Sequence, residues 1–129
     1  MQIKSKSGKI LHTFDDKTDL YGANLDRLHL HNADLRGADL TWATLCHTNL
    51  NDADLSHSNL WWADLSFTLM SGTNLHGANL DCVNMYCADL RGANLENIVL
   101  NENTNIGPST KLDPEQLTYL MLRGIRYGD

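Results

Sequence analysis

The sequence has little proline, little cysteine and no long apolar run. Its two prolines, Pro108 and Pro114, both come late in the 129 residues and leave the middle of the chain uninterrupted. No stretch approaches the ~18 apolar residues of a membrane span, and the first residues lack the apolar core of a signal peptide. Three cysteines without a CxxC motif favour free thiols in a reducing compartment. We therefore expect a cytoplasmic protein that does not enter a membrane.

Positive charge is also scarce. Ten Lys and Arg residues stand against sixteen Asp and Glu residues, which gives a formal net charge of −6. Direct binding to nucleic acid needs a basic surface, so we do not expect it. The sequence contains no convincing zinc site, nucleophile–base pair or phosphate-binding loop. We predict a protein that is not an enzyme and that needs no metal or cofactor.

What the sequence does contain is a five-residue repeat. Leucine or methionine recurs at every fifth position from Leu20 to Leu100. Five steps along an α-helix end about 140° from the starting face, and five steps along a strand reach the opposite face. Neither element buries such a series, so the chain must bend once in every repeat. Four bends close a square coil, and the next coil stacks on it at about 4.8 Å.

The repeat resembles the A-(D/N)-L-x-x motif of the pentapeptide-repeat proteins, and the resemblance extends from Thr18 to Glu102. It implies an all-β solenoid, a right-handed quadrilateral β-helix of about four coils. The residue two places before each central leucine is mostly alanine, which is small enough to share the interior. The residue one place before is mostly Asp or Asn, which can bond to nearby backbone at the corner. Local loosening is expected where bulkier or apolar residues interrupt the motif, at Leu28, Leu69, Met70, Val83, Met85, Ile98 and Val99.

Both ends of such a solenoid need caps, because a stacked coil leaves strand edges and core exposed. Residues 1–17 are predicted to form an N-terminal β-hairpin cap that turns at Ser7 and Gly8. Its apolar contacts should come from Ile3, Ile10 and Phe14. Residues 18–102 are predicted to form the β-helix.

Residues 103–129 are predicted to form a loop and a short C-terminal α-helix. Asp113 is a good N-cap, and Pro114 suits the first helical position. The helix should cover the last coil. It is also a candidate homodimer contact, since related proteins of this family can dimerise through their C-terminal ends. The outward apolar surface for that contact would come from Tyr119, Leu122 and Ile125.

Residues 20 apart should stand in one outward column. Trp42 and Trp62 share a column, Trp61 adjoins them, and Phe67 lies on the next side. Exposed tryptophan is enriched in binding hot spots, so these residues are a candidate protein-binding surface. The alternative is that the indoles only stack on each other and shield the backbone.

Residues 18–102 carry eleven acidic and three basic side chains, hence a charge of −8. Five of the acidic residues are predicted to form a protein-binding surface: Asp26, Asp52, Asp81, Glu96 and Glu102. The family resemblance supplies a precedent, because its quinolone-resistance members resemble a DNA rod in size and charge and bind DNA gyrase in place of DNA. The expected rod, about 20 Å tall, covers only about six base pairs, so gyrase itself is not carried over as the target.

These observations predict a non-catalytic protein-binding module. The leading hypothesis is an acidic DNA-mimic inhibitor of a DNA-handling protein, such as a topoisomerase or a defence nuclease. The alternative is a neutral interaction or assembly scaffold that uses the exposed aromatic column.

Overall fold

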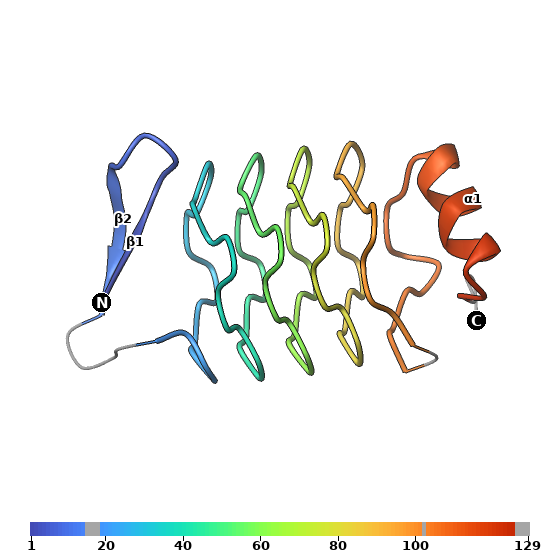
Figure 1. Ribbon diagram of the computed structural model, residues 1–129, viewed down its shortest axis with the longest axis horizontal. Helices are drawn as coiled ribbons and strands as arrows, with labels where there is room; N and C mark the ends of the chain where they lie inside the picture. The colour runs from blue at the N-terminus through green and yellow to red at the C-terminus, as the bar shows by residue number, and fades with distance from the viewer. Residues whose placement is uncertain (15–18, 102, 126–129) are drawn as a thin grey trace.

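The computed structural model describes residues 1–14, 19–101 and 103–125. Two strands, β1 (Gln2–Lys4) and β2 (Ile10–Thr13), come first, and one helix, α1 (Pro114–Leu122), comes last. Between them the chain winds as a solenoid, with the strands at one end and the helix at the other (Figure 1). The predicted β-solenoid and the predicted short C-terminal helix are thereby confirmed. No described helix is long and apolar enough to cross a membrane.

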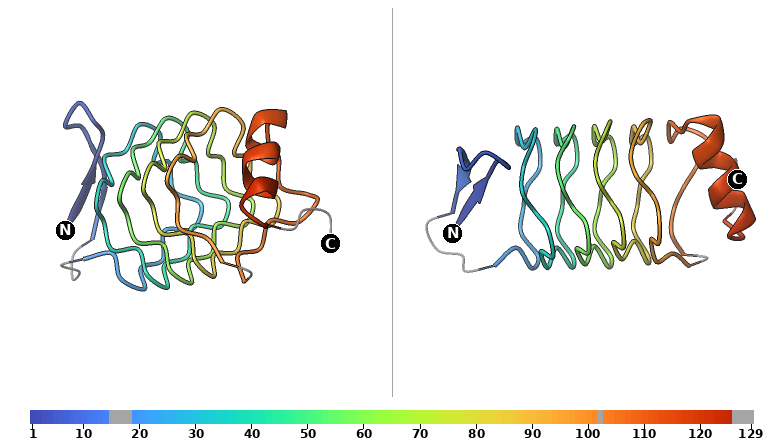
Figure 2. Two further views of the ribbon diagram at one scale, coloured as in Figure 1. Left: turned by 45° about the vertical axis from the view of Figure 1, so that its right-hand side comes forward. Right: turned by 45° about the horizontal axis from the view of Figure 1, so that its top comes forward.

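The coils are stacked by parallel backbone bridges between residues 20 apart, from Asn24 with Thr44 onward. Four five-residue repeats therefore complete one coil, and successive coils lie side by side along the long axis (Figure 2). From Leu25 to Leu90 each central amide donates to a carbonyl of the next coil, as Leu45 N does to Asp64 O at 2.8 Å. The backbone hydrogen bonds thus run along the axis and hold each coil to its neighbours.

The interior is filled by the central residues. From Leu20 to Leu95 all of them are at most 6 % exposed. Threonine takes the place of alanine in some repeats, and its hydroxyl is then buried but not unsatisfied. Thr48 and Thr68, both 0 % exposed, donate Oγ1 to carbonyls of the preceding coil at 2.6 and 2.8 Å. These bonds remove the desolvation cost that a buried hydroxyl would otherwise carry.

Every corner is a tight turn. Ala43 N donates to Leu40 O at 2.9 Å, and this pattern recurs along the solenoid. From Leu20 to Leu95 the second residue after each central one has a positive φ, as the third residue of a type II turn requires. The Asp or Asn before each central residue accepts from the amide two residues on, as Asp39 Oδ1 does from Thr41 N at 3.0 Å. The predicted corner role of these side chains is confirmed.

The expected loosening at the irregular repeats is found only in the turn bonds under two bulky residues that replace alanine: Leu28 N lies 3.4 Å from Leu25 O and Val83 N lies 3.3 Å from Leu80 O, compared with 2.9 Å at Ala43. The stacking itself is not disturbed. Leu69 and Val99 keep bridges to residues 20 away, and Met70 and Val83 are 0 % exposed. A flexible methionine fills the same space as leucine, which explains why the coil does not deform there. The register shifts only beyond Leu100, where Asn84 bridges Asn105 and Asp89 bridges Lys111.

The N-terminal end is closed by the antiparallel pair of β1 and β2. Lys6 N donates to Asn32 O at 2.9 Å and so joins the hairpin to the first coil. Ile3 is 2 % exposed and Phe14 packs against the core. Ile10 was expected to face the core as well, but it is 51 % exposed, because the register between the two strands shifts next to it.

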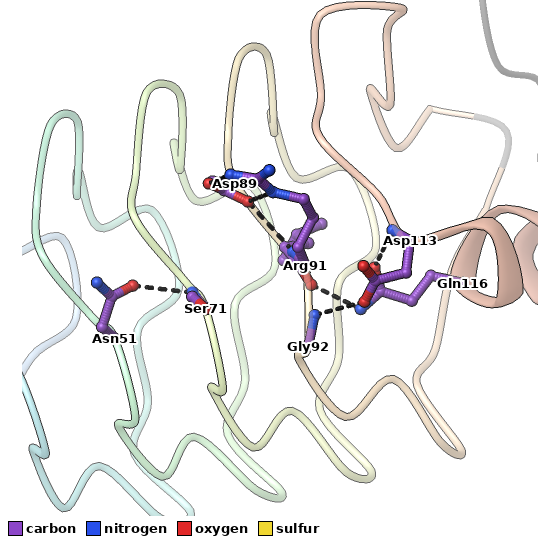
Figure 3. A network of polar contacts seen from close by, with 8 residues as sticks. Asn51, Ser71, Asp89, Arg91, Gly92, Asp113 and Gln116 are labelled. Carbon is purple, nitrogen blue, oxygen red and sulfur yellow. Dashed lines mark hydrogen bonds and ion pairs between the residues drawn. The ribbon is translucent and has the colours of Figure 1, made fainter.

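The C-terminal end is covered by α1 through the polar network drawn in Figure 3. Asp113 Oδ2 accepts from Gly92 N at 2.6 Å. Gln116 Nε2 donates to Leu90 O at 2.6 Å and to Ala93 O at 2.9 Å. The helix is thus bonded to backbone groups of the last coil and lies over that coil as a lid.

Candidate functional site

Three tryptophans form a continuous exposed cluster on one corner of the solenoid, the aromatic edge (Trp42, Trp61 and Trp62). The rings of Trp42 and Trp62 are stacked, with centroids 5.1 Å apart and planes 10° from parallel. Trp61 meets both of them edge-on, at 5.9 and 6.0 Å. The three side chains remain 48, 38 and 45 % exposed. The structure therefore brings together the three predicted tryptophans, because Trp42 and Trp62 are one coil of 20 residues apart and Trp61 is adjacent to Trp62 in the chain.

The backbone under this edge favours glycine. Trp42 and Trp62 have φ of 61° and 59°, and Gly22 holds the same place one coil earlier with φ of 62°. A bulky L-residue in this left-handed region costs roughly 1–2 kcal/mol. Stacking of the two rings returns about 0.5–1.5 kcal/mol, so the tryptophans give the fold little net stability.

A second aromatic edge lies on the neighbouring corner, one repeat further along the chain, and consists of His47, Phe67 and Tyr86. His47 and Phe67 stack with centroids 4.7 Å apart and planes 5° from parallel. Tyr86 meets Phe67 edge-on at 5.6 Å. Sequence reasoning selected Phe67 but missed Tyr86. The available signal was its position 20 residues after Ser66. Tyr86 takes the place of Ser66 in the next coil and therefore lies close to Phe67.

The wall between the two edges is polar. Thr44, Asp64 and Asn84 follow each other along it through backbone bridges. Burial raises the pKa of the Asp64 carboxyl, but hydrogen bonds from Ser66 outweigh this and leave the pKa below its ordinary value. Cys46 lies nearby with its thiol 3.3 Å from Ser66 Oγ, and burial raises the pKa of that thiol. A raised pKa disfavours the thiolate, so Cys46 is poorly suited to act as a nucleophile.

The predicted acidic surface is not brought together. Asp26, Asp52, Asp81 and Glu96 follow central residues on four different sides of the coil, so each lies on its own corner. Asp26 Oδ1 accepts from an amide of the next coil at 2.8 Å. Asp52 and Glu96 each have a histidine nitrogen within 4.0 Å. Glu102 falls outside the described residues.

Two other carboxylates are held by arginine. Arg36 donates Nε and Nη2 to the two oxygens of Asp34, both at 2.8 Å. Arg91 and Asp89 form the same arrangement at 2.9 and 2.7 Å. The hydrogen bonds from these guanidinium groups lower the pKa of both carboxyls. Part of the acidic charge of the rod is therefore locally compensated.

The three residues predicted for a dimer contact differ in how far their side chains are exposed. Leu122 is 84 % exposed, whereas Tyr119 is partly buried against the core. The expected outward position of Ile125 is wrong, because this side chain is only 9 % exposed. Gly124, with φ of 82°, reverses the chain, and Ile125 N donates to Leu120 O at 3.1 Å. This helix-ending turn directs Ile125 back toward the interior.

Among the described residues, no group of three or more His, Cys, Asp or Glu side chains could hold a metal ion. The aromatic edges are exposed and could contact a partner.

Comparison with known proteins agrees with the repeat geometry. The family described as pentapeptide repeats matches residues 16–52 and 62–97 in eight copies. A pentapeptide repeat protein (Rfr23) from the cyanobacterium Cyanothece 51142 is 32 % identical, with a TM-score of 0.64; the match covers 88 % of this chain and 75 % of that one. No curated protein matches the sequence.

Two further solved structures are more distant. A pentapeptide repeat protein from the Arabidopsis thaliana thylakoid lumen is 27 % identical, with a TM-score of 0.48 over 79 % of this chain and 73 % of that one. QnrB1, a plasmid-mediated fluoroquinolone resistance protein, is 22 % identical, with a TM-score of 0.34 over 83 % and 64 %. The chain belongs to the pentapeptide repeat family, and its solenoid is a right-handed β-helix.

Proposed function

We propose that the protein is a non-catalytic binding module that holds a partner protein through its aromatic edge. The observation that carries this proposal is the cluster of Trp42, Trp61 and Trp62, in mutual contact and each more than a third exposed. Tryptophan is strongly enriched among the residues that dominate binding energy at protein interfaces. A partner that covers these rings would remove their remaining apolar surface from water.

The backbone geometry shows that the tryptophans are not required for the turns of the fold. Gly22 shows that glycine satisfies this column at φ of 62°, and Gly37, Gly72 and Gly77 occupy equivalent turn positions on other corners. Tryptophan at such a position carries strain that stacking only offsets. Nine other described non-glycine residues, Arg27 and Asp52 among them, hold the same turn position with a positive φ, so this strain belongs to the fold as a whole, and the exposed ring cluster carries the proposal.

The second aromatic edge widens the proposed surface. It lies on the adjacent corner, so a partner seated on the intervening wall would touch both edges and the polar row of Thr44, Asp64 and Asn84. Aromatic anchors around a polar strip give both affinity and hydrogen-bonding specificity.

The test is capture of the partner from the native host with the tagged full-length chain. We expect the double variant Trp42→Ala, Trp62→Ala to lose capture of proteins that the unchanged chain retains. Leu69→Ala is the matched control, because Leu69 is 46 % exposed on another side of the coil. Circular dichroism and thermal unfolding establish that both variants fold. Unchanged capture by the folded double variant contradicts the proposal.

A second candidate function, mimicry of DNA toward a DNA-handling protein, rests on the −8 charge of residues 18–102. Such a partner would have to contact carboxylates on several corners of the coil, since the selected residues are spread around the rod. Here the triple charge reversal of Asp26, Asp52 and Asp81 to lysine should abolish binding, and duplex DNA should compete for the partner. Binding that survives the reversal, or that is insensitive to salt, rules this candidate out.

A further inference from the structure

A pocket of about 430 Å³ lies between the N-terminal hairpin and the first coil. Lys6, Ser7 and Lys9 line it from the hairpin, and His29 and His31 line it from the coil. The hairpin stands beside the first coil at the N-terminal end of the rod in Figure 1. No carboxylate is among the described lining residues, although the chain as a whole carries a net charge of −6. The pocket is thus a basic site on an acidic protein.

The two walls of the pocket are fixed to each other by backbone hydrogen bonds. Lys6 N donates to Asn32 O at 2.9 Å, and Asp34 N donates to Lys4 O at 2.7 Å. These bonds continue the stacking of the solenoid into the hairpin. The site is therefore formed before any ligand arrives, which lowers the entropy cost of binding.

The hairpin loop that carries both lysines is itself ordered by short contacts. Ser5 N donates to Lys9 O at 2.8 Å, and the hydroxyls of Ser5 and Ser7 lie 2.9 Å apart. Gly8 has φ of 88°, a conformation that glycine adopts without strain. The loop thus holds Lys6 and Lys9 near the same cavity.

On the coil wall, His29 and His31 flank Leu30, which is 0 % exposed. Since Leu30 faces the core, its two neighbours point their imidazoles outward, as alternation along an extended chain requires. The charge that faces His31 is Asp52 of the next coil, whose Oδ2 lies 4.0 Å from its Nδ1 and which does not line the pocket.

The two lysines are not neutralised by neighbouring acids. Among the described residues, neither Lys6 nor Lys9 forms an ion pair. Lys6 influences the carboxylate of Asp34, but Arg36 already donates Nε and Nη2 to the two oxygens of that carboxylate. The ammonium groups are therefore available to a ligand.

We propose that this pocket binds a small phosphorylated molecule, with the phosphate held by Lys6 and Lys9 and by imidazole N–H donors of His29 and His31. Every one of these groups can donate a hydrogen bond to a phosphate oxygen, and two ammonium charges match a dianion. The volume lies in the range of small-molecule sites and leaves room for an organic group beyond the phosphate. Leu11, which also lines the pocket, offers that group an apolar contact.

The test is an NMR titration of the uniformly ¹⁵N-labelled full-length protein with inorganic phosphate, adenosine monophosphate and adenosine. We expect saturable shifts of the amides of residues 5–9 and 29–32 with both phosphates and none with adenosine. The double variant Lys6→Gln, Lys9→Gln should bind at least about tenfold more weakly. Lys4→Gln is the matched control, because Lys4 lies on the same hairpin but does not line the pocket.

Several results would overturn the proposal. Absence of saturable shifts up to about 10 mM phosphate leaves no meaningful affinity for the site. Equal affinities of the double variant and the Lys4 control would show that the lysines do not bind the anion, provided that amide spectra away from the hairpin are unchanged. Tighter binding of a phosphoserine peptide than of adenosine monophosphate would assign the site to a modified protein instead of a small molecule.

Discussion

The indole of Trp62 lies over that of Trp42 with their ring centroids 5.1 Å apart, although both residues have backbone conformations that favour glycine. Side-chain contact and backbone preference therefore oppose each other at this edge. Two substitutions separate these effects: alanine removes the ring and keeps the strained φ, whereas glycine removes both the ring and the strain.

At position 62 we expect Trp62→Gly to be more stable than Trp62→Ala by roughly 1 kcal/mol, the reverse of the usual order, because φ is 59°. Both variants lose the same ring contacts, so the difference isolates the backbone term. Chemical denaturation measures it. Position 64, which has no positive φ, provides the comparison, since glycine there should be less stable than alanine. Equal stability of the two position-62 variants would contradict the strain argument.

Thr68→Val should lower the free energy of unfolding by about 1 kcal/mol, because the buried Oγ1 bond to Leu45 O at 2.8 Å is lost. The effect stays modest since Leu45 O keeps a bond from Thr48 N at 3.2 Å. Thr44→Val is the control, because its hydroxyl bond to Asn24 is exposed and 3.4 Å long. Thermal unfolding of both variants tests the difference; equal losses would argue against a structural role for the interior hydroxyls.

Asp89 gives a pH dependence with a defined sign. Its pKa is lowered chiefly by the side-chain hydrogen bonds of Arg91, so the folded-state pKa lies below the unfolded value of about 3.9. The stabilisation is complete above about pH 5 and is lost as the pH falls through the folded-state pKa.

Asp89→Asn should therefore reduce the fall in melting temperature on acidification below about pH 4. Asp39→Asn serves as the reference, since Asp39 bonds a turn amide and has no arginine partner among the described residues. If both variants show the acid sensitivity of the unchanged chain, the Asp89–Arg91 pair is not a source of it.

Homodimerisation through the C-terminal end stays a prediction. Its apolar surface reduces to Leu122 and Met121, which are 84 and 59 % exposed, with Tyr119 at the margin. Leu122→Glu should convert a dimer into a monomer in light scattering coupled to size-exclusion chromatography. Leu69→Glu, which adds the same charge elsewhere, should leave the dimer intact. A monomeric unchanged chain at high concentration would refute the prediction directly.

The interior and the corners were predictable from the sequence because the five-residue period is a local property of the chain. The same period placed Trp42 and Trp62 in one column. What escaped prediction depends on contacts between distant segments. Ile125 turns inward through the bond of its amide to Leu120, and Ile10 turns outward next to a register shift between β1 and β2.

The basic pocket was invisible in the sequence for a related reason. Lys6 and Lys9 lie about twenty residues before His29 and His31, and only the docking of the hairpin on the first coil joins them. Likewise, the scatter of the acidic residues over four corners becomes apparent only when each is assigned to its side of the coil. The net charge alone does not tell whether the acidic side chains share one side of the coil or are distributed around it.

The 20-residue coil also determines how such a molecule can grow. An in-frame duplication of residues 43–62 would insert one whole turn of the tube, and each new amide would meet the same kind of acceptor as the original. The ends would keep their own covers, while a third indole would join the stack above Trp62. The length of the solenoid and its exposed aromatic surface can therefore increase together in a single genetic event, while the interior keeps the same packing.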